Sequence, residues 1–439
     1  MFRYYAWLGA RSLRRNPILT TLMITAIALG IGAFMTLYAM FHMMSSDPIP
    51  WKSDKLHIVR VDNWSADEAW GETKDGPVPP DQVTYQDGRA LMQAREARYQ
   101  TLMMRVAFAV QPTHAEVKPF NAIARMTYAD FFPMFEPRFL FGGPWDRSVD
   151  DERAKVVVLS RETNDKIFGG EDSVGREVKL GDFNYRVVGV LDDWRPLPKY
   201  FDITQGEFDT PEDFYVPFTV NDDLRLRSAG NNNCYTSPAD ATYDAWLASE
   251  CVWLQFWVQV DSAAERDAYH AFLDAYVGEQ KKLGRFARPL NNRVQPVMSW
   301  LQERNVVGRD VPISLGIASA FLLVCLINTI GLMLAKFLGR SGEIGVRRAL
   351  GASRRQVFSQ FLIESGAIGL AGGLLGLVVA YAGLAGVRAL VRDAEPLTQL
   401  DPALVLFAIG LSMLASLLAG LFPTWRACQV APAAQLKSN

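Results

Sequence analysis

Residues 339–365 read GRSGEIGVRRALGASRRQVFSQFLIES, a charged segment between two long stretches that lack acidic and basic residues, 311–335 and 365–387. Residues 17–44 and 402–425 have the same apolar character. Each of the four stretches exceeds the roughly 20 apolar residues that a helix needs to cross the hydrocarbon core of a membrane. The sequence therefore predicts an α-helical membrane protein with four transmembrane helices.

Residues that favour the start and the end of helices divide the charged segment into two predicted helices. Glu343 stands at the positive end of the first helix, which is expected over 343–350, and Arg347 and Arg348 stand near its negative end. Gly351 is expected to end this helix in a left-handed conformation. The segment is therefore expected to fold back on itself at Gly351.

A second helix is expected to begin after Ser353. Ser353 and Gln356 have the spacing of a capping box, in which each side chain caps the backbone of the other. The helix then continues without a break into the apolar stretch 365–387. This arrangement predicts a rigid link between the segment and the membrane.

This charged segment also contains several apolar side chains. Their presence predicts a docking surface for a cytoplasmic protein. The alternative is an amphipathic element that lies on anionic lipid. The expected docking residues are Glu343, Ile344, Val346, Arg347, Arg348, Leu350, Ser353, Arg354 and Arg355.

Basic residues near the ends of the apolar stretches predict the orientation of the chain. Segments 1–16, 336–364 and 426–439 are rich in basic residues, whereas 388–401 has more acidic than basic residues. Basic flanks favour the cytoplasmic side. We therefore expect both termini and 336–364 in the cytoplasm, and 45–310 and 388–401 in the periplasm.

The first apolar stretch follows basic residues, as the core of a secretory signal does. A signal core has only about 7–15 apolar residues. Residues 17–44 form a longer run, so we expect an uncleaved membrane anchor.

The long segment 45–310 is expected to fold as an α+β periplasmic domain of two subdomains, with an insertion at about 126–250. Short apolar runs such as 155–159 predict strands, and Ser160 and Gly169 are placed to begin and end a helix. Asp81 is expected to cap another helix. An excess of acidic residues argues against nucleic acid as a partner.

Cys234 and Cys251 both lie in this domain. An oxidising periplasm would allow a disulfide between them, which would stabilise the domain by roughly 3 kcal/mol on the chain-entropy model. The alternative is two small buried thiols.

Small residues in the third apolar stretch form two ladders, Gly369 with Gly373 and Gly372 with Gly376. Such ladders let helices approach closely, either within the chain or in a dimer. Asn328 is a polar residue in the second stretch, and we expect it to form a packing hydrogen bond.

Signatures of catalysis and of metal binding are missing from the sequence. The 4 histidines are scattered without the spacing of metal ligands. A Gly-x-x-x-x-Gly-Lys phosphate loop is also missing. We therefore expect a non-catalytic chain without a cofactor or metal of its own.

Several motifs resemble one family. EIGVRRALGASRR at 343–355, QFLIES at 360–365 and GLFPTWRACQVAPAAQL at 420–436 are similar to FtsX/MacB-type permeases of ABC transporters. FNAIARMTYADFF at 120–132 and the two segments 154–180 and 185–194 resemble the MacB-type periplasmic core domain. The match covers both ends and most of the middle of the chain.

The resemblance implies that the chain is part of a type VII ABC transporter in the inner membrane. By this resemblance, the expected parts are a cytoplasmic ABC ATPase dimer, which binds ATP and magnesium, and a second permease, either a copy of this chain or a similar one. Motion of the ATPase would pass to the periplasmic domain and drive efflux or extraction, with a periplasmic adaptor and an outer-membrane channel as optional partners. The alternative is an FtsX-like scaffold that regulates a periplasmic enzyme such as a cell-wall hydrolase.

Overall fold

The computed structural model describes residues 16–112, 118–390 and 402–428. Two compact units make up the chain. The first, which we call the helical unit, comprises Met1–Ser45 and Val307–Asn439, and the second, the sheet domain, comprises Ser46–Val306.

Four long helices form the helical unit. They are α2 (Pro17–Ser45), α11 (Asp310–Leu338), α13 (Arg354–Leu390) and α14 (Pro402–Cys428). All 4 are long and apolar enough to cross a membrane, which confirms the predicted helices. A short fifth helix, α12 (Ser341–Ala349), stands between α11 and α13.

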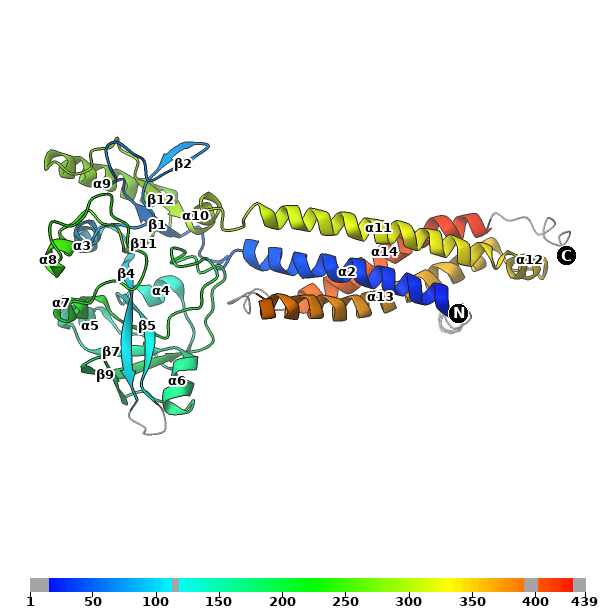
Figure 1. Cartoon of the computed structure of the whole chain (residues 1–439), viewed down its shortest axis with the longest axis horizontal. Coiled ribbons are helices and arrows are strands. Elements are labelled where there is room, and N and C mark those ends of the chain that lie inside the picture. Colours follow the sequence, from blue (N-terminus) through cyan, green and yellow to red (C-terminus); the bar gives the residue numbers. More distant parts are fainter. Residues whose placement is uncertain (1–15, 113–117, 391–401, 429–439) are drawn as a thin grey trace. The chain divides into compact units, whose positions relative to one another are not determined.

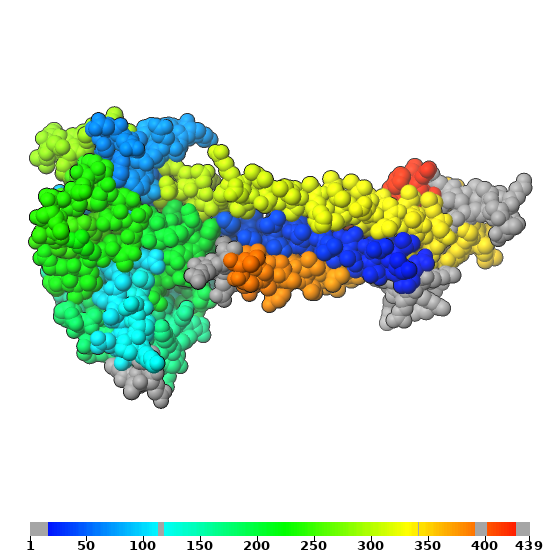
Figure 2. All heavy atoms as spheres, viewed as in Figure 1, coloured from blue at the N-terminus to red at the C-terminus, as the bar shows by residue number. Residues whose placement is uncertain are grey.

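The helix α2 lies between α11 and α13, as the space-filling view shows for the blue, yellow and orange segments (Figure 2). On α2, Met23, Ile27, Ile31 and Met35 follow each other at intervals of one helical turn, and each is fully buried. This spacing places the four side chains on one face. The core of the helical unit therefore forms around α2.

The sheet domain is built on one large sheet (Figure 1). Its strands are β1 (Leu56–Arg60), β4 (Tyr99–Gln111), β5 (Phe120–Thr127), β6 (Phe139–Gly142), β7 (Val156–Leu159), β8 (Glu177–Leu180), β9 (Phe183–Leu191), β10 (Phe214–Pro217), β11 (Gln255–Gln259) and β12 (Arg293–Pro296). The 10 strands follow the order β12-β1-β11-β4-β5-β10-β7-β9-β6, and β8 pairs with β4 and β9. A separate hairpin consists of β2 (Gly71–Thr73) and β3 (Gly76–Val78).

Helices of various lengths pack around this sheet. They are α3 (Tyr85–Ala94), α4 (Phe131–Phe135), α5 (Arg147–Glu152), α6 (Arg161–Phe168), the 3-10 helix η1 (Phe218–Val220), α7 (Asn221–Leu224), α8 (Tyr243–Leu247), α9 (Ala263–Lys282) and α10 (Val297–Glu303). The predicted caps of α6 are confirmed, because the Ser160 side chain accepts from the Thr163 backbone and Gly169 is left-handed.

The prediction that Asp81 caps a helix is wrong. Thr84 caps α3 by accepting a hydrogen bond from the Asp87 backbone. The Asp81 carboxylate instead lies 3.1 Å from the guanidinium of Arg60, and both side chains are buried. A buried charge needs a partner, so the ion pair takes precedence over the cap.

Strand β4 shows how the sheet builds two hydrophobic cores. Leu102 and Met104 belong to one core, and the intervening Met103 belongs to the other. Successive strand residues point to opposite faces, so each face receives alternate side chains. The segment 126–250, predicted as an insertion, contributes β6 to β10 to this same sheet.

Candidate functional site

The α12–α13 hairpin has the local structure that its sequence predicts. Gly351 has a φ of +99°, which is the left-handed conformation expected at the end of α12. The Ser353 backbone donates to Gln356 Oε1 at 2.9 Å, and the Gln356 backbone donates to Ser353 Oγ at 3.3 Å. The capping box is therefore confirmed.

The three apolar candidates for docking are not equivalent. Ile344 is only 4% exposed and belongs to the hydrophobic cluster that contains Val357 and Phe361 of α13. Val346 and Leu350 are 53% and 84% exposed. Ile344 is one of the expected docking residues, but its side chain is buried and holds α12 against α13, so it does not present an apolar anchor.

Arg347 also has a role within the hairpin. Its guanidinium lies 2.6 Å from Glu343 Oε1 and donates to Gln360 Oε1 at 3.0 Å. The hydrogen bond to Gln360 joins α12 to α13, whereas the pair with Glu343 lies within α12. Among the other expected docking residues, Arg348 is half-buried, and Ser353, Arg354 and Arg355 are exposed.

A buried ion pair lies where α11 and α13 approach each other. Lys336 Nζ of α11 is 2.6 Å from Glu364 Oε1 of α13, and both side chains are fully buried. Lys336 also donates to Thr20 Oγ1 of α2 at 3.1 Å. Three membrane-length helices therefore meet at one ion pair.

This ion pair continues to α12. Arg340 Nη1 lies 3.2 Å from Glu364 Oε2, and Arg340 Nε lies 3.7 Å from Glu343 Oε2. Glu343 in turn pairs with Arg347. We call the series Lys336, Glu364, Arg340, Glu343 and Arg347 the ion-pair chain.

Sequence reasoning missed the ion-pair chain because it treated Lys336 and Glu364 as the borders of a loop. The available signal was that opposite charges stand at the facing ends of two consecutive apolar stretches. Removing one partner of a buried pair costs about 3–5 kcal/mol, because the other charge stays buried alone. The contact between Lys336 and Glu364 is therefore a strong constraint on the helices.

The glycine ladders of α13 lie against two different helices of the same chain. A Cβ added at Gly369 would lie 1.9 Å from Ser416 Oγ of α14, and one at Gly373 would lie 2.8 Å from Ser412 Cβ. A Cβ added at Gly372 or Gly376 would lie 2.7 or 3.0 Å from an isoleucine of α2. Both ladders therefore serve packing inside the helical unit.

Asn328 lies exposed on α11. It has no hydrogen bond to any residue that the structure describes. The expected packing hydrogen bond is therefore not formed within this part of the chain.

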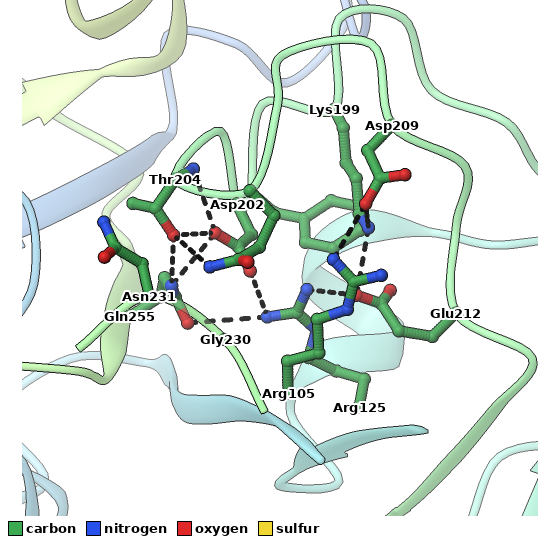
Figure 3. A network of polar contacts seen from close by, with 12 residues as sticks. Arg105, Arg125, Lys199, Asp202, Thr204, Asp209, Glu212, Gly230, Asn231 and Gln255 are labelled. Atoms are coloured by element: carbon green, nitrogen blue, oxygen red, sulfur yellow. Dashed lines mark hydrogen bonds and ion pairs between the residues drawn. The ribbon is translucent and has the colours of Figure 1, made fainter. Parts of the chain in front are cut away.

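A second buried polar network lies in the sheet domain (Figure 3). The Arg125 guanidinium contacts Glu212 and lies 2.7 Å from Asp202, and all three side chains are almost completely buried. Lys199 Nζ lies 3.0 Å from Glu212 Oε1. Burial alone would raise the pKa of Glu212, but the charges of Arg125 and Lys199 lower it to about 2. Sequence reasoning did not find this network, because its members come from segments far apart in the chain.

The sheet domain also contains the two candidate cysteines, and the structure joins Cys234 and Cys251 in a disulfide. Asn233, next to Cys234, and Val252, next to Cys251, pair through their backbones in an isolated β-bridge. In the described ranges, His, Cys, Asp and Glu residues form no group of three or more that could hold a metal ion.

The arrangement of these parts defines a multi-pass membrane protein with a large extramembrane α/β domain between its first two long helices. The sequence matches the MacB-like periplasmic core domain over residues 20–276 and the FtsX-like permease C-terminal domain over residues 315–432. The chain belongs to this family of MacB/FtsX-type ABC transporter permeases.

The relatives include two ATP-binding/permease proteins and one permease. The macrolide export ATP-binding/permease protein MacB of Wolinella succinogenes is 27% identical over 298 residues, which are 66% of this chain and 40% of that protein. The pyoverdine export ATP-binding/permease protein PvdT of Pseudomonas entomophila is 26% identical over 65% of this chain and 38% of its own length. The ABC transporter permease YknZ of Bacillus subtilis is 38% identical over 28% of this chain and 30% of its own length. The chain thus spans less than half of these relatives.

Solved structures similar to this chain include the periplasmic region of MacB from Actinobacillus actinomycetemcomitans, with 13% identity and a TM-score of 0.36. It is matched over 59% of this chain and 96% of that structure. The extracellular domain of YknZ has 12% identity and a TM-score of 0.33, over 55% of this chain and 99% of that structure.

Proposed function

We propose that this chain is a multi-pass inner-membrane permease subunit that transmits the motion of an ATPase to its sheet domain. The α12–α13 hairpin would receive the motion in the cytoplasm, where both termini also lie. The sheet domain and residues 388–401 would lie in the periplasm. A second permease, either a copy of this chain or a similar one, would complete the transporter.

The ion-pair chain is the observation that carries this proposal. A docking element transmits force only when its displacement also moves the membrane helices. Arg340 and Glu343 connect α12 to Glu364 of α13, and Lys336 extends the connection to α11 and α2. A displacement of α12 would therefore act on three long helices together.

The docking contact itself is assigned to the exposed part of the hairpin. Val346 and Leu350 present apolar surface, and Arg354 and Arg355 lie exposed close by. Apolar anchors that fill a pocket in a partner can contribute 2 kcal/mol or more each, whereas exposed charges contribute about 0–1 kcal/mol. We therefore propose Leu350 as the main anchor.

ATP hydrolysis is assigned to an ABC ATPase dimer outside these 439 residues, because they contain no phosphate-binding loop. The partner would bind ATP and magnesium. The purified chain is expected to hydrolyse no ATP, as a colorimetric phosphate assay can measure. Saturable turnover that persists after co-purifying ATPases are removed would contradict this assignment.

Efflux or extraction from the periplasm or the outer leaflet is the proposed purpose of this motion. Its support is that several relatives are named as exporters, of macrolides or of pyoverdine. Neither substrate is assigned to this chain. A periplasmic adaptor and an outer-membrane channel are the further partners that such export would use.

The substitution Leu350→Asp tests the docking assignment. We expect it to abolish co-purification of the ATPase with tagged full-length chain from native membranes. Leu283→Asp is the matched control, because Leu283 is 75% exposed but belongs to the sheet domain. The docking assignment is wrong if the Leu350 variant retains the ATPase at the wild-type ratio.

The substitution Glu364→Gln tests transmission separately from docking. It removes the charge that joins Lys336 to Arg340. We expect the ATPase to stay bound while ATP turnover by the complex is no longer changed by the permease. Loss of the ATPase from this variant, or unchanged coupling, would contradict the role of the ion-pair chain.

A further inference from the structure

The sheet domain contains a pocket of about 480 Å³ that lies far from the α12–α13 hairpin in sequence. It is formed by the start of α6, by the segment that follows β9, and by residues 210–213 before β10. All of its lining residues belong to the sheet domain. The proposed function gives this pocket no role.

Acidic side chains dominate the pocket lining. Its carboxylates are Glu162, Asp165, Asp192, Asp193, Glu212 and Asp213, and its only basic lining residues in the described chain are Arg161 and Arg195. Glu212 is already balanced by its ion pairs with Arg125 and Lys199 (Figure 3). The remaining side chains give the pocket an excess of negative charge.

The basic residues at the rim hold their partners only weakly. Arg195 lies 2.9 Å from Asp193 and 3.9 Å from Glu162, and Arg161 lies 3.0 Å from Asp192. These side chains are 39–85% exposed, and solvent-exposed ion pairs are readily exchanged for other partners. Asp165 forms no ion pair with any described residue. Several carboxylates are thus available to a ligand.

Two buried residues of the lining carry unpaired polar atoms. Glu212 Oε2 and Tyr215 Oη have no hydrogen-bond partner in the described part of the chain. Tyr215 is fully buried and Glu212 is 2% exposed. Buried polar atoms nearly always have a partner. Both oxygens can accept a hydrogen bond, so a donor in the pocket would satisfy them.

An aromatic side chain completes the lining. Trp194 is half-buried and stacks on Phe201, with ring centroids 5.4 Å apart and planes at 9°. This stacking fixes the indole in place. Aromatic rings attract ammonium and guanidinium groups through their electron-rich faces.

The start of α6 does not reverse this preference for cations. A helix begins with partial positive charge, but Glu162 lies in the first turn of α6. Asp213 also approaches this turn and accepts from Thr163 Oγ1 at 3.5 Å. Acidic groups therefore already occupy the positive end of the helix.

We infer that this pocket binds a compact organic cation that carries ammonium or guanidinium groups. The cation would replace the rim arginines at the exposed carboxylates and would donate toward Glu212 and Tyr215, with its carbon chain against Trp194. This inference does not depend on the proposed transport function, because the ligand would bind in the absence of an ATPase.

Isothermal titration of the purified full chain in detergent micelles with spermidine tests the inference. We expect saturable binding with one site per chain. Asp165→Lys should weaken binding about tenfold, because it places a positive charge in the pocket. Glu68→Lys is the matched control: it changes the net charge equally at an exposed position outside the pocket, and it should bind as the wild type does.

A gain of affinity gives a second test that misfolding cannot imitate. Arg195→Gln frees the carboxylates of Asp193 and Glu162, so spermidine should bind about two- to fivefold more tightly. Lys74→Gln removes an exposed positive charge outside the pocket and should leave the affinity unchanged. The inference is overturned if spermidine does not bind saturably. It is also overturned if each pocket variant matches its control.

Discussion

At the scale of single residues, local signals were predictable and burial was not. Ser353 and Gly351 behave as the sequence predicted, because capping and left-handed turns depend on a few neighbouring residues. Ile344 and Leu350 looked alike in the sequence, yet one is buried and the other is 84% exposed. Their difference arises from the packing of α12 on α13, which a short sequence window does not contain.

Asp150 is expected to make the stability of the sheet domain depend on pH. Burial raises the pKa of its carboxyl from 3.8 to about 7, although the Ala129 backbone and Trp145 donate to it. A raised pKa means that protonation stabilises the folded state. This contribution is complete below pH 3.8 and is lost as the pH rises through about 7.

The free energy of unfolding of the wild type should therefore increase by about 1 kcal/mol from pH 8 to pH 6 relative to Asp150→Asn. Unfolding of the full chain in detergent, followed by tryptophan fluorescence, measures this difference. Asp151→Asn is the control, because the neighbouring Asp151 side chain is 72% exposed. Equal pH dependence in the wild type and in Asp150→Asn would refute the prediction.

At the scale of elements, composition and periodicity predicted the long helices and several strands. They did not predict which elements pack or pair with one another. The four long helices were predictable because each is encoded in one continuous segment. The order of the sheet was not, because β1 pairs with β11 and β12, which lie far along the chain. The glycine ladders predicted close approach but left the partner open, and the structure identifies α2 and α14.

The substitution Gly369→Leu is expected to destabilise the helical unit. Even a Cβ at this position would lie 1.9 Å from Ser416 Oγ, and overpacking of this kind typically costs about 1–3 kcal/mol. Ser412 Oγ also donates to the Gly369 carbonyl at 2.5 Å, so the contact between α13 and α14 would open. The midpoint of thermal unfolding in detergent should fall.

Gly386→Leu is the matched control on the same helix. A Cβ at Gly386 meets no atom within 4 Å. Its midpoint should stay near that of the wild type or rise, because leucine favours helix more than glycine does. Equal destabilisation by the two substitutions would show that packing against α14 is not the cause.

At the scale of the whole molecule, the fold class and the family were predictable from the sequence, and the buried ionic networks were not. Apolar stretches and ordered motifs extend over most of the chain, so they define the architecture by themselves. Arg125 and Glu212 are 87 residues apart, and their pairing depends on how β5 and the segment before β10 meet. Such contacts follow from the assembled sheet, and no local pattern encodes them.

The disulfide between Cys234 and Cys251 is expected to stabilise the sheet domain. It closes a short loop, with a sequence separation of 17. Replacing both cysteines by alanine should lower the free energy of unfolding by roughly 3 kcal/mol on the chain-entropy model. A reducing agent should destabilise the wild type to a similar extent and leave the double variant unchanged.

Non-reducing peptide mapping of protein from membranes checks the bond directly and should yield one cross-linked peptide pair. Alkylation of both cysteines in the folded, unreduced protein would contradict the bond. An equal effect of reductant on both proteins would show that the stabilisation has another origin.

The length of α13 has a mechanical consequence. At 1.5 Å per residue, its 37 residues extend for roughly 55 Å, so a tilt of about 5° at one end displaces the other end by about 5 Å. Glycine recurs along this helix, and each interior glycine weakens a helix by about 1 kcal/mol relative to alanine. The stiffness of this long helix therefore depends on its packing against neighbouring helices. In the proposed function, α13 would carry the motion only while α2 and α14 pack against it, and weaker packing would let the helix bend instead.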